Sequence, residues 1–360
     1  MLYLSLLDYI LLLVVPPITG LYQTEVNHYP TRVYYYTVPP GAEASMDYLR
    51  TPDERFERLP GFQFKPHYLQ NGDLRIAYID ERNGDSSEVF LCLHGEPTWS
   101  YLYRKMIPVL LNYTTKSEQT LSRRVVAPDF FGFGRSDKPR QDAAYNFDLH
   151  RDAMVDLIES LNLTNITLVV RDWGGLIGLT LPITDPRRFK RVIVMNTTIG
   201  SGAGKSQAVL DWIAYTSSTP DLDVADLMDK LGHPPKRAYR APFPDDTYKG
   251  GVRRFPRMIL IEEDMPGVEI SKKSRHFFET TDTLGKETVF VVCGMQDPIL
   301  GPHMKSLARV FRNGCCYAKI EDASHFVQEW GDQVAKLAIE VFENHGNTAG
   351  VQEIKAEGAK

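Results

Sequence analysis

The chain has 360 residues, a length typical of one large domain or of a core domain with an inserted module. Hydrophobic residues make up 43% of the chain and charged residues 24%, which excludes an intrinsically disordered chain and a coiled coil. Lysine and arginine number 41 against 46 aspartates and glutamates, and the resulting net charge of −5 argues against nucleic acid as a partner.

The first 45 residues are expected to be an N-terminal extension that contains an apolar segment, residues 2–15 (LYLSLLDYILLLVV). This segment is shorter than the ~18–20 residues that span a bilayer, and it carries Asp8. It lacks the basic region and the small-residue cleavage site of a secretory signal. We therefore expect membrane association only through residues 2–15, with a signal or anchor left open. The four cysteines form no CxxC pair and favour a reduced, cytoplasmic location.

Short apolar runs bounded by glycine or polar residues predict buried strands. They lie at residues 89–93, 125–127, 167–170, 192–195, 289–292 and 317–320. Helical patterns such as residues 148–161 separate most of these runs. The alternation predicts an α/β fold with a mostly parallel sheet and helices on both faces.

The alternation fails between residues 201 and 264, which are rich in proline, glycine and charge and contain helical fragments such as 223–231. We interpret this stretch as an inserted helical cap. The expected core then consists of residues 46–200 and 265–345, and the polar residues 346–360 are expected to form a flexible tail.

The segment 168–181 (LVVRDWGGLIGLTL) contains an apolar strand that runs into Asp172, two glycines and an apolar helix. Glycines at this place allow the sharp strand-to-helix turn of the nucleophile elbow of α/β-hydrolases. Asp172 then occupies the tip, where a carboxylate can attack carbon and form a covalent ester. The alternative is that Asp172 only caps the helix, a place that aspartate favours.

Two further residues favour the catalytic interpretation of Asp172. Asp297 follows the strand predicted at 289–292, and His325 follows the strand predicted at 317–320. The order Asp172, Asp297, His325 is the nucleophile–acid–base order of α/β-hydrolases, and all three residues follow strand ends. His94 belongs to a loop after an early strand, where backbone N–H groups form an oxyanion hole.

At this point the chain resembles the haloalkane dehalogenases, and among them the subfamily typified by the Xanthobacter dichloroethane enzyme. The resemblance covers roughly residues 49–345, cap included. It rests on five motifs in the same order, which are HGEPTWSYLYRKMIP at 94–108, APDFFGFGRSDKP at 127–139, LVVRDWGG at 168–175, APFPD at 241–245 and SHFVQEWG at 324–331.

The resemblance implies a role for each member of the predicted triad. Asp172 is expected to be the nucleophile, His325 the general base and Asp297 the acid that orients the base. Another subfamily carries its acid after the preceding core strand, where this chain has Asn196, so Asp297 is left as the acid.

The resemblance also implies the groups that bind anions and substrate. The backbone N–H groups of Glu96 and Trp173 are expected to form the oxyanion hole, and Trp173 and Trp212 are expected to bind the halide, because an indole N–H only donates. The expected partners are a small apolar halogenated substrate, water and halide, with no metal and no organic cofactor, and the chain is expected to be a monomer. The expected substrate pocket contains Leu176, Val209, Phe255, Pro256 and Ile299.

Two other enzyme classes share this scaffold and stay open. An epoxide hydrolase uses the same Asp nucleophile, but it needs two cap tyrosines to protonate an alkoxide, and the candidates are Tyr215, Tyr239 and Tyr248. A luciferase-like monooxygenase is closest to the subfamily with its acid after the earlier strand, so Asn196 argues against it. A binding protein with a silent site is disfavoured by the intact triad.

Overall fold

The computed structural model describes residues 46–85, 88–113, 122–203, 206–231 and 235–356. The expected N-terminal extension, with its apolar segment at residues 2–15, lies outside the described residues. Within the part of the chain that is described, no helix combines the length and the apolar character needed to cross a membrane.

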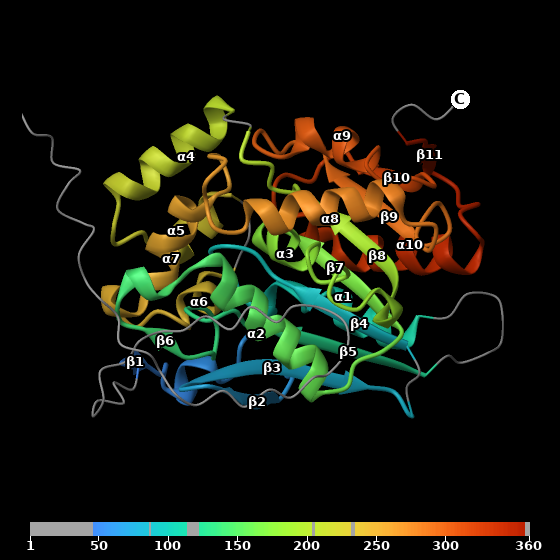
Figure 1. The fold of residues 1–360 in the computed structure, drawn as a ribbon. Helices are drawn as coiled ribbons and strands as arrows, with labels where there is room; N and C mark the ends of the chain where they lie inside the picture. Colours follow the sequence, from blue (N-terminus) through green and yellow to red (C-terminus); the bar gives the residue numbers. More distant parts are fainter. Residues whose placement is uncertain (1–45, 86–87, 114–121, 204–205, 232–234, 357–360) are drawn as a thin grey trace, which may run out of the picture. The chain divides into compact units, whose positions relative to one another are not determined.

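A nine-stranded sheet forms the centre of the fold (Figure 1), with the strand order β11-β10-β9-β8-β7-β4-β5-β3-β2. A second, two-stranded sheet pairs β1 with β6. The strands are β1 Tyr48–Leu49, β2 Pro66–Asn71, β3 Leu74–Arg82, β4 Glu88–Leu93, β5 Arg123–Pro128, β6 Lys138–Pro139, β7 Ile166–Arg171, β8 Phe189–Met195, β9 Val289–Gly294, β10 Cys315–Ile320 and β11 Gln352–Ile354.

The six predicted strands are all confirmed, as β4, β5, β7, β8, β9 and β10, and they pair in parallel. Every residue of β4, β7 and β9 is buried, since helices cover both faces of a parallel sheet. The predicted α/β fold with a mostly parallel sheet is therefore confirmed.

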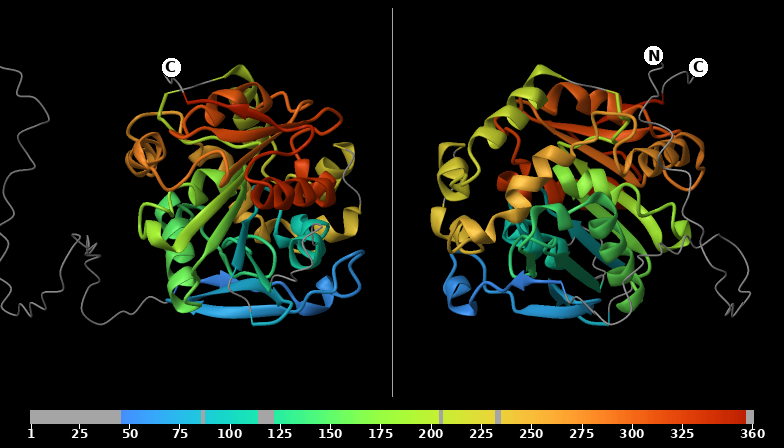
Figure 2. Two further views of the ribbon diagram at one scale, coloured as in Figure 1. Left: turned by 90° about the vertical axis from the view of Figure 1, so that its right-hand side faces the viewer. Right: turned by 60° about the vertical axis from the view of Figure 1, so that its left-hand side comes forward.

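Helices cover the sheet on two sides. Figure 2 shows α2, α3 and α8 on one face and α1 and α10 on the other, and α1 packs against α10. The predicted helix at 148–161 is α2, which begins after Asn146 because that side chain accepts a hydrogen bond from the Leu149 N–H. The helices are α1 Met106–Asn112, α2 Phe147–Ser160, α3 Asp172–Gly178, α4 Gln207–Ser218, α5 Val224–Lys230, α6 Lys236–Arg240, α7 Gly250–Arg254, α8 Val268–Thr280, α9 Met304–Ala308 and α10 Gly331–Glu343.

The sheet extends beyond the predicted strands at both edges. At one edge β2 and β3 form an antiparallel hairpin next to β5. At the other edge β11 pairs antiparallel with β10, and Ile354 is buried there. The prediction of a flexible tail over 346–360 is therefore wrong for residues 352–354. These residues form a short edge strand, which their mostly polar composition does not predict.

The stretch interpreted as a cap is helical in the described residues. Between β8 and α8 it contains α4, α5, α6 and α7, followed by a 3-10 turn at Phe255–Met258. The predicted helical fragment at 223–231 corresponds to α5, which begins where Asp223 accepts the Asp226 N–H. The boundaries of the cap stay a prediction.

Candidate active site

A strained turn between β7 and α3 presents the Asp172 side chain. Its φ of +46° lies in the left-handed region, which is costly for a residue other than glycine and is typical of functional sites. The turn is tight because two glycines follow it: a Cβ on Gly174 would lie 2.0 Å from the Leu93 carbonyl oxygen, and one on Gly175 would lie 2.0 Å from Thr197 Oγ1. Asp172 is the first residue of α3, and Arg171 stands at the N-cap position, so the structure does not place Asp172 where the capping alternative requires it.

The structure brings the three residues of the predicted triad together at the carboxyl ends of their strands. Asp172 Oδ2 lies 3.6 Å from His325 Nε2, and His325 Nδ1 lies 2.8 Å from Asp297 Oδ2. A carboxylate only accepts hydrogen bonds, so in the neutral ring Nδ1 carries the proton and Nε2 is the basic nitrogen, on the side of Asp172. Asp172 and His325 retain side-chain exposures of 18% and 19%, which leaves both accessible.

Asp297 is held by more than the histidine. Its Oδ1 accepts the backbone N–H groups of Ile299 and Leu300 at 2.8 and 3.1 Å, and its Oδ2 accepts the side-chain amide of Asn196 at 2.7 Å. Burial raises the pKa of Asp297, but the bonds to His325 and to these donors outweigh it and hold the pKa far below its usual range. Asp297 is thus a fixed anion.

Opposing effects set the pKa values of the other two residues. Burial raises the pKa of Asp172, but the Arg171 charge and His325 outweigh it, and the pKa of Asp172 lies below its usual value. Burial and Arg171 lower the pKa of His325, but the two carboxylates outweigh them and raise it. Asp172 is therefore ionised at neutral pH.

Both predicted oxyanion donors lie at the Asp172 carboxylate. The Glu96 N–H donates to Oδ1 at 2.9 Å, and the Trp173 N–H also bonds the carboxylate. His94 is fixed nearby as a neutral ring, because its Nε2 accepts the Phe130 N–H at 2.9 Å and burial lowers its pKa to about 4.

Gly95 leaves the space that Asp172 occupies, since a Cβ at Gly95 would lie 2.3 Å from Asp172 Oδ1 and 2.7 Å from Arg171 Nη1. We expect Gly95→Ala to displace the carboxylate and reduce turnover on the order of 10²-fold. Steady-state turnover measures the effect, and thermal unfolding monitors the fold. Wild-type turnover in Gly95→Ala would refute this packing constraint.

Of the predicted halide and pocket residues, the structure places Trp173, Leu176 and Phe255 together near the elbow. Trp173 is 2% exposed, and its ring centroid lies 4.8 Å from that of Phe255. Trp212 and Val209 lie half-buried on α4, which packs against the turn that contains Phe255 and the buried Pro256. Ile299 lies beside the acid through its backbone N–H.

The three candidate cap tyrosines lie on three separate elements, Tyr215 on α4, Tyr239 on α6 and Tyr248 in a 3-10 turn. Tyr239 is fully buried and donates its hydroxyl to Glu329 at 3.3 Å, next to Arg104. Tyr215 lies on α4 with 45% exposure. Tyr248 lies half-buried in the turn Asp246–Tyr248.

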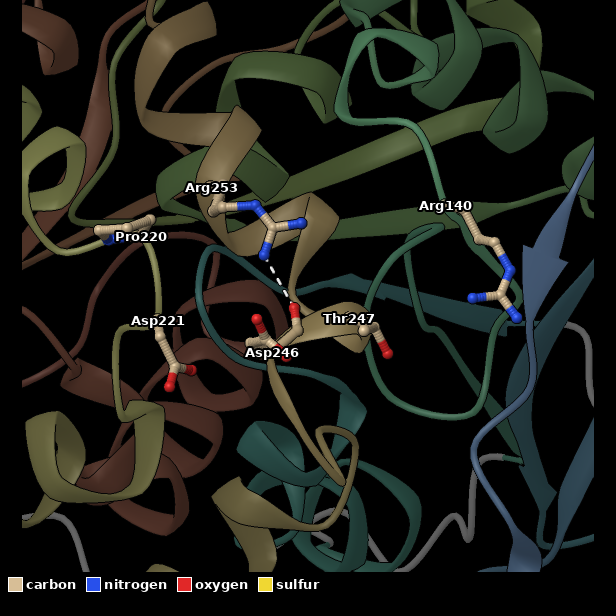
Figure 3. Close-up of a pocket in the computed structure, with 6 residues that line it drawn as sticks. All are labelled: Arg140, Pro220, Asp221, Asp246, Thr247 and Arg253. Atoms are coloured by element: carbon tan, nitrogen blue, oxygen red, sulfur yellow. Dashed lines mark hydrogen bonds between the residues drawn. The ribbon is translucent and has the colours of Figure 1, made fainter.

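A charged surface pocket of about 420 Å³ lies apart from the triad residues, between the cap and the loop that contains Arg140 (Figure 3). Two of its ionic groups already have partners: Arg253 binds the Asp142 carboxylate at 2.8 Å and the Asp246 carbonyl oxygen at 2.8 Å, and Asp221 pairs with Lys249. We therefore assign no ligand to it. The lining residues are Arg140, Pro220, Asp221, Asp246, Thr247 and Arg253.

Among the described residues, no group of three or more His, Cys, Asp and Glu side chains is arranged to hold a metal ion. Sequence reasoning missed two residues of the site. It noted Asn196 only for lacking a carboxylate, whereas its amide binds Asp297. It passed over Arg171, a charged residue that ends an apolar strand beside the predicted nucleophile, which was the available signal.

Comparison with known proteins places this site in a class and then in a family. Residues 88–332 match the model of the alpha/beta hydrolase fold. The chain is 36% identical to the haloalkane dehalogenase of Psychrobacter cryohalolentis over 322 residues, which cover 83% of this chain and 99% of that protein. It is 38% identical to haloalkane dehalogenase 1 of Mycobacterium tuberculosis, over 79% of this chain and 94% of that protein.

A solved structure supports the same assignment. The chain is 46% identical in sequence to the haloalkane dehalogenase DpaA from Paraglaciecola agarilytica, whose structure is tetrameric. The two structures match with a TM-score of 0.75, over 81% of this chain and 98% of that one. The chain belongs to the haloalkane dehalogenases, hydrolases of the α/β-hydrolase superfamily. The predicted family and enzyme class are thereby confirmed.

Proposed function

We propose that the chain hydrolyses carbon–halogen bonds of haloalkanes through a covalent ester on Asp172, giving a primary alcohol and halide. The observation that supports this best is the state of the Asp172 carboxylate. Oδ1 is held by the Glu96 N–H at 2.9 Å, whereas Oδ2 lies on the side of His325. One oxygen is thereby fixed and the other is available to attack carbon.

In the first step, an Oδ2 electron pair of Asp172 forms a bond to the substrate carbon while the halide leaves with the electron pair of the carbon–halogen bond. Halide needs no proton, so this step requires no acid. In the second step, His325 Nε2 takes a proton from water, and the water oxygen adds to Asp172 Cγ.

The π pair of the ester carbonyl moves to Oδ1, where the N–H groups of Glu96 and Trp173 hold the charge. Collapse breaks the bond from Cγ to the alkoxide, which takes the proton from His325 and leaves as the alcohol. The regenerated Asp172 carboxyl loses its remaining proton to solvent. The sum is haloalkane plus water giving alcohol, halide and a proton.

A substrate panel tests this function. Purified protein is mixed with bromo- and chloroalkanes of increasing chain length, and halide release is measured beside diol formation from epoxides. We expect halide release and no diol. Diol formation without halide release across the panel would instead make the protein an epoxide hydrolase.

We infer that Trp173 and Trp212 bind the departing halide, Trp173 from the elbow and Trp212 from the half-buried face of α4. Indole N–H groups suit a soft anion because they donate without ionising. We expect Trp212→Leu to weaken bromide binding about 10-fold, the loss of roughly one hydrogen bond, measured by quenching of the remaining tryptophan fluorescence. Tyr215→Phe on the same helix is the control. Unchanged bromide affinity in Trp212→Leu would remove this residue from the site.

We further infer that the chain belongs to the subfamily of the Xanthobacter enzyme. Support comes from the place of the acid: Asp297 follows β9, and the residue after β8 is Asn196. Leu176, Val209, Phe255, Pro256 and Ile299 are proposed to line the substrate pocket. Leu176 and Val209 stand where the type enzyme has phenylalanines, so we expect longer bromoalkanes to be preferred over dichloroethane in the panel.

We propose that residues 46–200 and 265–345 form the catalytic core and residues 201–264 the cap. Residues near the start of the described chain hold the proposed cap. Thr51 Oγ1 donates to the Pro242 carbonyl oxygen at 2.7 Å, and Arg55 Nε donates to the Ala241 carbonyl oxygen at 2.8 Å. A protein that starts at Met46 is therefore expected to keep wild-type halide release per folded molecule. A folded but inactive truncated protein would give residues 1–45 a role in catalysis.

The expectation that the chain is a monomer is at odds with the tetrameric structure of the DpaA enzyme. We infer that this chain also self-associates, because the two are 46% identical over almost the whole of that enzyme. Light scattering coupled to size-exclusion chromatography measures the mass. A monomeric mass at micromolar concentration would restore the original expectation.

A further inference from the structure

Arg171, the last residue of β7, is fully buried and lies next to both Asp172 and His325. Its Nη2 donates to the His325 carbonyl oxygen at 3.0 Å, and its Nη1 lies 3.7 Å from Asp172 Oδ1. The guanidinium stands over the Phe326 ring, 4.6 Å from the centroid. Neither Nε nor Nη1 donates a hydrogen bond to a described residue. Burial of a cation is costly unless its charge is compensated, and the ion pair with Asp172 supplies that compensation.

The Asp172 oxygen next to Arg171 is the one proposed to receive negative charge. Oδ1 accepts the Glu96 N–H and becomes the carbonyl oxygen of the ester once Oδ2 has bonded to carbon. Addition of water to Cγ moves the π pair onto Oδ1, 3.7 Å from Arg171 Nη1. In a buried site this attraction is screened far less than in water.

We propose that Arg171 is a positioning residue for hydrolysis of the alkyl-enzyme: it fixes the backbone of His325 and supplies positive charge behind the oxyanion hole. The inference rests on the proposed function and extends it. The benefit falls on the second step because the same cation also stabilises the free Asp172 carboxylate, which does not favour its attack on carbon. Only an interaction that strengthens toward the transition state accelerates a step.

The charge of Arg171 also acts on the base. The groups that face His325 are Asp172 from α3, Asp297 from the loop after β9 and Arg171 from β7, and Glu96 faces Asp172 from the loop after β4. Hydrolysis needs a neutral imidazole, so its rate falls as pH decreases through the pKa of His325. A neighbouring cation lowers that pKa. Removing the cation therefore moves the acidic limb of the hydrolysis profile to higher pH.

Two variants separate charge from packing. Arg171→Gln removes the charge but keeps an amide that can donate to the His325 carbonyl, and Arg171→Lys keeps the charge. With 1-bromobutane in a rapid-quench experiment, halide release in the first turnover measures ester formation, and mass spectrometry of the intact protein follows loss of the butyl-enzyme.

For Arg171→Gln we expect ester formation close to wild type, hydrolysis slowed on the order of 10-fold to 100-fold with accumulation of butyl-enzyme, and an acidic limb at higher pH. For Arg171→Lys we expect faster hydrolysis than in Arg171→Gln and an unmoved limb. If Arg171→Gln does not fold, the pH profile of hydrolysis in Arg171→Lys decides the question. An acidic limb that moves although the charge is kept would overturn the effect of the Arg171 charge on His325, and an unmoved limb would support it.

Equal slowing of both steps in Arg171→Gln, or hydrolysis at the wild-type rate, would overturn the role of Arg171 while leaving the proposed function intact. Failure of the proposed function looks different, because the wild-type protein would then form no butyl-enzyme at all. A limb that shifts by the same amount in both variants would mean that packing, and not charge, connects Arg171 to the base.

Discussion

Asp172→Asn is expected to lower halide release by about 10⁴-fold or more. An amide oxygen is a poor nucleophile, and without an ester on this residue neither step can proceed. Steady-state halide release with a bromoalkane measures the loss, and mass spectrometry should detect no alkylated protein.

The asparagine variant should fold, which makes the loss interpretable. Asparagine tolerates the left-handed backbone region that Asp172 occupies at a φ of +46°, and its amide oxygen can still accept the Glu96 N–H. Asp332→Asn, at an exposed position in the first turn of α10, is the control for charge loss alone. Substantial halide release from Asp172→Asn would show that another residue attacks the substrate.

His325→Ala is expected to allow the first step of the reaction and to block the second, because only the second step needs a base. Halide leaves carbon without a proton, so the first turnover should release about one halide per active site and then stop. The alkyl-enzyme should accumulate, visible as an increase in the mass of the intact protein and of the peptide that contains Asp172. Overall turnover should fall about 10⁴-fold or more.

His303→Ala, at an exposed histidine, is the control for this trapping experiment and should turn over normally. Continued turnover by His325→Ala would mean that another group activates water. Loss of the first-turnover halide as well would mean that His325 acts before hydrolysis, through the geometry of Asp172, which lies 3.6 Å from its Nε2.

The central sheet was largely predictable because its strands are buried on both faces. Such strands are continuous apolar runs, as at 89–93 and 289–292, and their bounds agree with β4 and β9 within one or two residues. The β2–β3 hairpin was missed because β2 contains no buried residue, and because the buried run of β3, residues 76–79, is short and lies between the charged residues Arg75 and Asp80. The strand Gln352–Ile354 was missed because a short edge strand buries little and its sequence is mostly polar.

The meeting of Asp172, Asp297 and His325 was predictable because these residues follow strand ends in a fixed chain order. What sequence could not give is which neighbours hold them. The amide of Asn196 reaches Asp297 across 101 positions of sequence, and Arg171 reaches the His325 carbonyl across 154. Both contacts depend on the side-by-side packing of β7, β8, β9 and β10, so no local sequence pattern predicts them.

A single turnover in H₂¹⁸O tests most directly whether the reaction passes through an ester on Asp172. With enzyme in excess over a bromoalkane, the alcohol oxygen comes from Asp172 Oδ2, so the alcohol should contain no ¹⁸O. The label should instead appear in the peptide that contains Asp172, since the attacking water adds to its Cγ. An alcohol that carries ¹⁸O after the first turnover, with an unlabelled Asp172 peptide, would show that water attacks the substrate carbon directly and would contradict the covalent mechanism.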